Sequence, residues 1–596
     1  MASPTRPAYG GLRRKLVIAI DVGTTFSGVC YSILDPGEIP EIRAVLRYPG
    51  QEKVGDTKIP TLMWYDQSGS VQAAGAEATR SGIAIDAEEQ QWIKSEWFKV
   101  YLRPKAIDAP GELHKIPPLP LGKTVVEVFA DFLRYIYECT KTYIRETHSN
   151  GKAMWDSFED EIDFVLTHPN GYEGPQQSVM REAAVLAGLV PDQDASNRRV
   201  QLVTEGEASL HYCLQSGLST DVLKQGKGLM VIDAGGGTID FSSYVQNGES
   251  FEEIAAPECL YSGSVFVTSR ARIFFENLLA NTRFSEDVDL ITERFDNNTK
   301  PSFNTDEDDY WIQFAAVREK DPKLNIRSGQ LKISGSDVAS FFERSISDIV
   351  TSVDEQTFSA KTEITSAFLV GGFATSDWLY SRIQERLDLL GIEVSRPDSG
   401  TSKAVAHGAV SYYLDHRVTT RVSKVTYGVP CSVPYDPTND EHIKRASSKY
   451  RSAAGVWYIP GAFDVILPRN IQVAETKEFR RSFGRTRPQA SALRKVTTSI
   501  MCYRGDIEKP VWVDVEPEKF TSMGNIEADL GELTKTLKPH VTINDGGEEE
   551  TYYSIDFDIA LLFGMTEFKA LVIWQENGEE KRNSAVKVKF NPEEVE

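Results

Sequence analysis

The sequence contains few cysteines, a deficit of basic residues and no long apolar run. Its 6 cysteines are scattered over 596 residues without a CxxC pair, which excludes a disulfide framework and the usual zinc spacings. The 65 basic residues are outnumbered by 87 acidic ones, and the net charge of −22 argues against a protein that mainly binds nucleic acid. No apolar run reaches the ~18 residues that a membrane span needs. We therefore expect a cytoplasmic protein with reduced thiols that binds neither nucleic acid nor a membrane.

The N-terminal segment is expected to be a disordered leader over residues 1–14. It ends in basic residues, but the apolar run that follows, residues 16–20, is too short for a secretion signal. This run leads directly into a turn rich in glycine and threonine, so we predict that it is the first strand of a folded domain.

Three short apolar runs stand directly before glycine-rich turns, at residues 16–20, 229–232 and 367–370. Such runs are typical of strands that are buried on both faces of a sheet. Helical patterns lie between and after them, at residues 125–140, 176–190, 208–214 and 376–390. Strands that alternate with helices over this length predict an α/β class.

The pattern changes after about residue 417, where long helical periods are missing. Apolar and polar residues alternate over 511–515 and 553–559, and residues 569–574 and 585–590 flank Asn577-Gly578, a hairpin signal. We therefore expect an antiparallel β domain over residues 418–596.

Two polar segments of this region, residues 436–455 and 477–495, are expected to be long loops. The second is basic, which is typical of a solvated loop, although a phosphate-bearing partner is an alternative. Its basic residues are Lys477, Arg480, Arg481, Arg485, Arg487, Arg494 and Lys495.

Two of the glycine-rich turns repeat one pattern, DVGTT at residues 21–25 and DAGGGT at residues 233–238. Glycine lets backbone N–H groups approach phosphate oxygens closely, and the threonine hydroxyls add donors. The aspartates repel phosphate, but they can hold a hydrated Mg²⁺ beside it. One such turn is also typical of a purely structural bend. Two copies and a third turn at Gly371-Gly372 favour a nucleotide site with Mg²⁺ between two opposed phosphate-binding hairpins.

In this order, these motifs resemble the actin-like ATPase superfamily and, within it, the 70-kDa heat-shock protein (DnaK-like) family. The resemblance covers about residues 15–417 and is closest to a divergent, lid-less branch found in vertebrates and filamentous fungi. It rests on IDVGTTFS at 20–27, LTHP at 166–169, EGEA at 205–208, IDAGGGTID at 232–240, FLVGGF at 368–373 and AVAHGA at 404–409.

The resemblance implies a two-lobed actin-like ATPase domain with a ribonuclease H-like fold over residues 15–417. Lobe I would take about residues 15–214 and 400–417, and lobe II about residues 228–399. The β domain over residues 418–596 would follow without a helical lid.

The resemblance also implies the roles of individual residues toward ATP or ADP and Mg²⁺. The metal shell would be held by Asp21, Glu205 and Asp233, with Asp240 in support. The phosphates would contact Gly23, Thr24, Thr25, Gly235, Gly236, Gly237 and Thr238. The catalytic set would be Asp21, Lys99, Glu205, Asp233 and Thr238, with Lys99 reaching the γ-phosphate. The adenosine side would use Gly371, Gly372, Phe373 and Lys300.

The resemblance implies slow, Mg²⁺-dependent ATP hydrolysis in a chaperone-like protein that binds client polypeptides or a co-chaperone. One alternative is a nucleotide-binding scaffold without hydrolysis, because the adenosine side departs from the family; Pro301, for example, stands where an arginine is expected. A sugar or acetate-type kinase is a further alternative. Lys99 could also be an ordinary surface lysine, and Glu205 a first-turn acid that the helix dipole favours.

Overall fold

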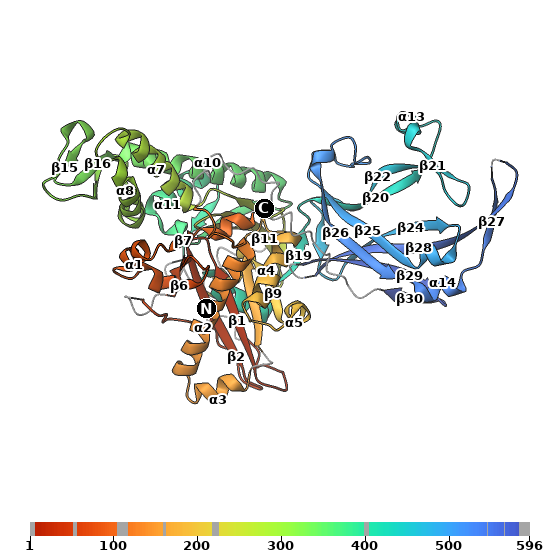
Figure 1. The fold of residues 1–596 in the computed structure, drawn as a ribbon, viewed down its shortest axis with the longest axis horizontal. Helices are drawn as coiled ribbons and strands as arrows, with labels where there is room; N and C mark the ends of the chain where they lie inside the picture. Colours follow the sequence, from red (N-terminus) through yellow and green to blue (C-terminus); the bar gives the residue numbers. More distant parts are fainter. Residues whose placement is uncertain are drawn as a thin grey trace. The chain divides into compact units, whose positions relative to one another are not determined.

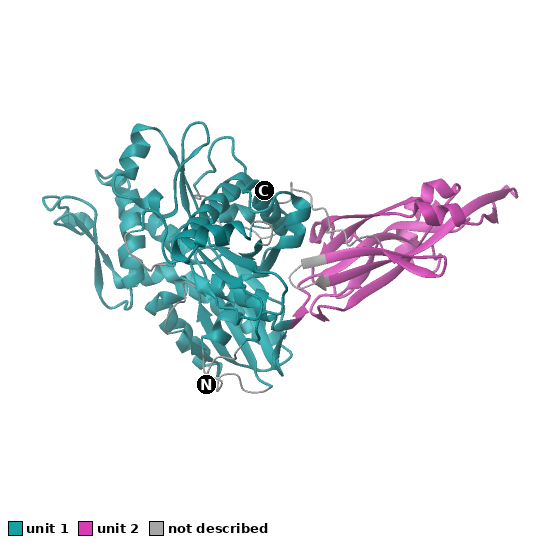
Figure 2. Ribbon diagram, turned by 90° about the horizontal axis from the view of Figure 1, so that it is seen from below, with its two compact units in different colours: residues 1–418, 595–596 teal, residues 419–594 magenta. Residues whose placement is uncertain are grey.

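The computed structural model describes residues 6–51, 57–103, 117–158, 162–216, 226–397, 404–544, 546–564 and 567–582. They contain helices and several sheets (Figure 1), so the predicted mixed α/β class is confirmed. The chain divides into two compact units between Val418 and Thr419 (Figure 2). None of the described helices is both long and apolar enough to cross a membrane.

Unit 1 contains one sheet near its N-terminus, in the order β3-β2-β1-β8-β9, with β4 paired to β2. β1 runs antiparallel to β2 and parallel to β8, and β8 runs parallel to β9. The strands are β1 (Lys15–Val22), β2 (Phe26–Leu34), β3 (Arg43–Ala44), β4 (Lys58–Pro60), β8 (Ile162–His168) and β9 (Val200–Thr204).

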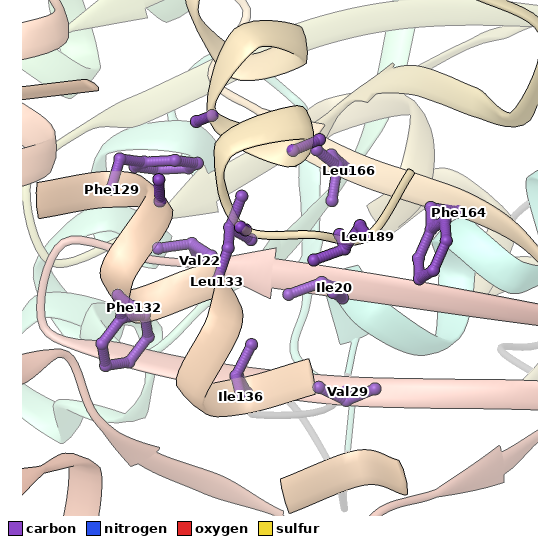
Figure 3. Close-up of a cluster of buried hydrophobic side chains, with 14 of the residues drawn as sticks. Ile20, Val22, Val29, Phe129, Phe132, Leu133, Ile136, Phe164, Leu166 and Leu189 are labelled. Atoms are coloured by element: carbon purple, nitrogen blue, oxygen red, sulfur yellow. The ribbon is translucent and has the colours of Figure 1, made fainter. Parts of the chain in front are cut away.

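Two helices, α2 (Val125–Thr147) and α4 (Gly174–Leu186), contact one another beside this sheet. α2 begins at a capping box in which Thr124 and Glu127 satisfy each other's backbone N–H groups. Figure 3 shows Leu133 and Ile136 of α2 beside Ile20 and Val29 of the sheet. Burial of each such side chain contributes about 1.5–3 kcal/mol, so this layer fixes the strand that leads into the first glycine turn.

A second sheet of unit 1 repeats this arrangement, with β18, β17, β10, β11 and β12 in that order and β13 paired to β11. β10 is antiparallel to β11 and parallel to β17, as β1 is to β2 and β8. The second glycine turn therefore follows β10 as the first follows β1. The strands are β10 (Gly228–Ala234), β11 (Ile239–Asn247), β12 (Ser250–Glu253), β13 (Glu258–Leu260), β17 (Ile364–Val370) and β18 (Glu393–Ser395).

The core of this second lobe is formed with α7 (Ser264–Leu279), α10 (Gly335–Ser359) and α11 (Asp377–Asp388). α11 begins at Ser376, whose hydroxyl accepts a hydrogen bond from the N–H of Leu379. The predicted helix over residues 376–390 is thus confirmed, because a serine cap and an apolar face both mark its start.

Two helices cross between the sheets, α6 (Glu205–Gln215) and α12 (Ala404–Asp415). α6 contacts β10 and β11 of the second sheet and also β8 and β9 of the first, whereas α12 contacts β1, β2 and β8. At the crossing, a Cβ on Gly408 would lie 1.7 Å from the carbonyl oxygen of Ala208. Only glycine allows this approach of the two backbones.

The N-terminal segment differs from the disordered leader expected over residues 1–14. Residues 1–5 lie outside the described residues, but Arg6 forms an ion pair with Asp415 at the end of α12, with 2.8 Å between Nε and Oδ1. The backbone of Tyr9 also pairs with that of Gly37 and Glu38. Local sequence patterns do not reveal such contacts between distant segments.

Unit 2 contains two groups of strands, and all the pairings within each group are antiparallel. The first group orders β21-β22-β20-β25-β26, and the second orders β24-β28-β29-β30 with β27 beside β28. The main strands are β20 (Thr426–Pro434), β22 (Trp457–Leu467), β24 (Glu478–Arg487), β25 (Lys495–Tyr503), β26 (Phe520–Asp529), β28 (Glu549–Gly564) and β29 (Glu567–Glu576). The short ones are β21 (Tyr450–Arg451), β27 (His540–Ile543) and β30 (Glu579–Arg582).

The predicted loop over residues 477–495 is wrong, because most of it forms β24. Phe479 and Phe483 pack against the core of unit 2, while Arg480 pairs with Glu478 and with Glu580. The many charged residues of this segment made the alternation of apolar and polar residues, which is typical of a strand, hard to recognise in the sequence. Four of its basic side chains, Arg480, Arg481, Arg494 and Lys495, form ion pairs with acidic neighbours.

Two other expectations for unit 2 have opposite outcomes. Residues 511–515 are not a strand, and Trp512 makes only an isolated bridge with Ala462. Asn577 and Gly578 do join β29 to β30, with φ values of 54° and 80° that suit the predicted hairpin. The strand expected over residues 585–590 lies outside the described residues.

The close crossing of α6 and α12 predicts that a methyl group added at Gly408 destabilises the protein. Gly408→Ala forces a carbon against the Ala208 carbonyl, so we expect unfolding free energy to fall by about 3 kcal/mol, despite the higher helix propensity of alanine. Chemical denaturation of both proteins measures this difference. Gly10→Ala is the control, because nothing lies within 4 Å of its Cβ position. Equal stability of Gly408→Ala and wild type would contradict the close crossing.

Candidate functional site

A cavity of about 260 Å³ lies in unit 1 and is lined by all three glycine turns. The structure brings together most of the predicted site residues at its walls. These are Asp21, Gly23, Thr24, Thr25, Lys99, Glu205, Asp233, Gly235, Gly236, Gly237, Thr238, Gly371 and Gly372. Phe26, Thr57, Lys58 and Val405 also line it and were not predicted.

The two phosphate-type turns face each other directly. A Cβ on Gly236 would lie 2.4 Å from Oγ1 of Thr25, and a Cβ on Gly237 would lie 2.4 Å from Oγ1 of Thr24. Any side chain at these glycines would therefore push the turns apart. The absence of Cβ lets the backbones of both turns and the threonine residues line one small space, and glycine backbone of this kind can approach an anion closely.

The third turn lies against the end of β10. Gly371 has a φ of 92°, and a Cβ there would lie 2.4 Å from both the Ala234 carbonyl oxygen and Oδ1 of Asp233. Both the backbone conformation and the contact require glycine. The third turn is thus packed on the aspartate of the second.

Three buried carboxylates line the cavity, and each has a defined partner. Asp21 accepts hydrogen bonds from Lys58 Nζ and from Thr167 Oγ1, both at 2.9 Å. Asp233 accepts one from Ser209 Oγ at 2.7 Å. Glu205, the first residue of α6, forms a 2.5 Å ion pair with Lys99.

The burial of Lys99 excludes an ordinary surface lysine, and the ion pair gives Glu205 a partner in addition to its helix. The side chain of Lys99 is 4% exposed and that of Glu205 is 11% exposed, so neither lies on the outer surface. Glu205 does occupy the first turn of a helix, but its carboxylate also points to a buried ammonium group across the cavity wall.

Negative charge accumulates around Asp233. Burial, with the nearby Glu205 carboxylate, raises the pKa of Asp233 to about 7. Burial, with Glu205 and Asp233, raises the pKa of Asp240 to about 8. Burial also raises the pKa of Glu205, although Lys99 opposes this change. Asp21 differs, because Lys58 and Lys99 outweigh its burial and hold its pKa below the ordinary value.

This surplus of negative charge fits a cation in the cavity. No group of three or more His, Cys, Asp or Glu side chains in the described ranges could bind a metal ion directly. The carboxylates of Asp21, Glu205 and Asp233 can instead accept hydrogen bonds from the water shell of Mg²⁺, an ion that usually keeps several of its waters. A cation there would favour the ionised form of Asp233.

Three predicted site residues do not line the cavity. Asp240 is buried beside Asp233 in the β10–β11 ladder and accepts a hydrogen bond from the N–H of Asn170. Phe373 is buried in the core of the second lobe against Phe342. Lys300 forms an ion pair with Asp296.

Sequence reasoning missed Lys58, which contributes an ammonium group to the cavity wall. Lys58 begins the three-residue strand β4 and follows no glycine motif. Only the pairing of β4 with β2 places it beside Asp21. The sequence shows no local signal for this position.

Comparisons with known proteins agree with the resemblance. The chain is 24% identical over 583 residues to heat shock 70 kDa protein 12B of Homo sapiens, and the match covers 82% of this chain and 80% of that protein. It is 24% identical over 570 residues to heat shock 70 kDa protein 12A of Mus musculus, with 79% and 80% covered. No family model matches the chain. The similarity to 70-kDa heat-shock proteins extends over more residues than unit 1 contains.

The raised pKa of Asp233 predicts a pH dependence of ligand binding. Below about pH 7 this carboxyl holds a proton, which a bound cation must displace, so affinity for a magnesium nucleotide should fall as pH decreases from 8 to 6. Ser209→Ala removes a hydrogen bond that favours the charged form, so the midpoint should shift upward by roughly one pH unit. Calorimetric titration at saturating Mg²⁺ measures both effects.

The control is Ser196→Ala, which removes another fully buried serine of unit 1, one that lies outside the cavity. It should leave the midpoint in place. A midpoint that is the same for wild type and Ser209→Ala would show that Asp233 does not set the pH dependence.

Proposed function

We propose that unit 1 is a two-lobed actin-like ATPase domain whose cavity binds ATP or ADP with Mg²⁺ and hydrolyses ATP slowly. The observation that carries this proposal is the direct opposition of the two glycine turns, with Thr25 against Gly236 and Thr24 against Gly237. Backbone N–H groups presented from both sides suit a chain of phosphates better than a single anion. The similarity to 70-kDa heat-shock proteins supports this proposal.

The residues of the cavity suggest how hydrolysis would proceed. Thr24, Thr25 and Thr238 would donate hydrogen bonds to phosphate oxygens and hold the phosphates in line. Mg²⁺, when bound, would neutralise charge on the β- and γ-phosphates. Asp233 would accept hydrogen bonds from the water shell. Lys99, which Glu205 holds in place, would position the attacking water and the γ-phosphate.

The chain as a whole would act as a chaperone-like nucleotide switch. Unit 2 would then bind client polypeptides or a co-chaperone in the cytoplasm, as part of a 70-kDa heat-shock-like protein. This part of the proposal rests on the similarity to heat shock 70 kDa proteins 12A and 12B, which extends beyond unit 1.

A nucleotide-binding scaffold without hydrolysis is the second candidate. Two residues expected beside adenosine favour it: Lys300 forms an ion pair with Asp296, and Phe373 is buried in the core. Two residues expected beside adenosine are therefore occupied elsewhere. Binding without turnover would separate this candidate from the first.

Asp233→Asn tests the proposal on the purified full chain. We expect wild type to bind ATP with Mg²⁺ and to hydrolyse it in a single-turnover assay, and the variant to lose at least about 100-fold in hydrolysis rate, because it removes a group that positions the reaction. Asp163→Asn is the matched control, since Asp163 is also a buried aspartate but pairs with Lys15 outside the cavity.

Full activity in Asp233→Asn would overturn the assignment of the catalytic site. Binding of Mg²⁺ and ATP by wild type without hydrolysis would select the scaffold. Absence of any binding to ATP and ADP would reject nucleotide binding itself.

A further inference from the structure

Lys58 reaches the cavity by passing over a glycine of the neighbouring strand β2. It pairs with Gly28 in the β2–β4 ladder. A Cβ on Gly28 would lie 3.3 Å from Cγ of Lys58 and 2.9 Å from the Thr57 carbonyl oxygen. The missing side chain leaves room for the start of the lysine stem, which brings the ammonium group to Asp21 and the first phosphate-type turn.

The two lysines of the cavity differ in their exposure. The Lys58 side chain is 21% exposed, whereas that of Lys99 is 4% exposed. Lys99 is enclosed with its glutamate, whereas part of the Lys58 side chain is exposed and Lys58 lines the cavity. A ligand in the cavity can therefore contact Lys58 without rearrangement of the wall.

The contacts of Asp21 are divided between its two oxygens. Lys58 donates to Oδ2, while Thr167 donates to Oδ1. If Lys58 turns away, Asp21 still keeps the hydrogen bond from Thr167. Oδ2 then becomes free for another donor, such as a water molecule of a hydrated cation.

Charge favours this exchange when a polyphosphate enters. Among the residues that the structure describes, the cavity walls carry the carboxylates of Asp21, Glu205 and Asp233 and the two ammonium groups of Lys58 and Lys99. A polyphosphate brings several further negative charges, and a charge-assisted hydrogen bond to phosphate is among the stronger polar contacts. An exposed lysine beside the phosphate-type turns is the nearest group of this kind.

We propose that Lys58 is a phosphate-binding residue of this cavity. Its ammonium group moves from Asp21 Oδ2 to the terminal phosphates, and this oxygen then becomes available to the water shell of a divalent cation. The inference rests on the proposed function. It adds a phosphate-binding residue and relates the phosphate contact to the binding of the cation. Phosphate contact by Lys58 precedes or accompanies cation binding. The cavity accordingly retains affinity for polyphosphates in the absence of a divalent cation.

Calorimetric titration of the full chain with sodium tripolyphosphate and with ATP, each in EDTA and in Mg²⁺, tests this proposal. In EDTA, Lys58→Met should weaken tripolyphosphate binding by about 10-fold or more, because one charge-assisted hydrogen bond is lost. Lys123→Met is the matched control. Lys123 is also a partly buried lysine, with a side chain 19% exposed, and pairs with Asp131 outside the cavity. It should bind tripolyphosphate as wild type does.

A charge cycle makes the test independent of the stability of Lys58→Met, which leaves Asp21 without its ammonium partner. Asp21→Asn releases Lys58 and should tighten tripolyphosphate binding in EDTA. The double variant Asp21→Asn/Lys58→Met should lose this gain. Both proteins lack the buried unpaired carboxylate, so their comparison isolates Lys58. Thermal unfolding of each variant shows that it is folded.

The outcomes separate this proposal from the proposed function. Equal binding by Asp21→Asn and the double variant overturns the role of Lys58, while ATP binding by wild type still supports the nucleotide site. Tighter binding of Mg²⁺ and ATP by Lys58→Met also overturns it, because Lys58 would then only compete with the cation. Lys58-dependent binding of tripolyphosphate without binding of ATP supports Lys58 and rejects the nucleotide site. Binding of neither ligand rejects both.

Discussion

The contact between two glycines and two threonines is the constraint on which unit 1 depends. Gly236 and Gly237 approach Thr25 and Thr24 so closely that no side chain fits between them. Each turn must therefore leave its sheet at a fixed point. The repeated arrangement of β1 with β2 and β8, and of β10 with β11 and β17, supplies these points in both lobes. The two sheets thus hold the glycine turns on opposite sides of the cavity.

Electrostatics in this space are balanced from two sides. Lys58 and Lys99 each neutralise one carboxylate, whereas Asp233 relies on the hydroxyl of Ser209. The protein thus places its ammonium groups at Asp21 and Glu205 and leaves the remaining deficit of positive charge at Asp233. Burial strengthens each of these interactions, because water is kept from the charges.

The sequence contains enough local signal to predict the strands before the glycine turns and most of the cavity residues. Glycine, aspartate and threonine at fixed spacing are typical of one local backbone geometry, which is why residues 21–25 and 233–238 could be identified as turns of the site. Lys58 could not be predicted, because its position depends on a pairing between β2 and β4. Lys300 illustrates the converse: its residue type suited the expected role, but the adjacent Asp296 engages it. Residues 477–495 were misjudged because their many charged residues obscured two partly buried phenylalanines that pack against the core of unit 2.

The crossing of α6 and α12 limits how one helix can slide along the other. At Gly408 the backbones touch without an intervening side chain, and the neighbouring positions of α12 carry larger residues. Sliding one helix along the other would drive such a residue into the Ala208 carbonyl. The contact therefore fixes the position of the two helices along their lengths, and with it the distance of each helix from the strands that it covers.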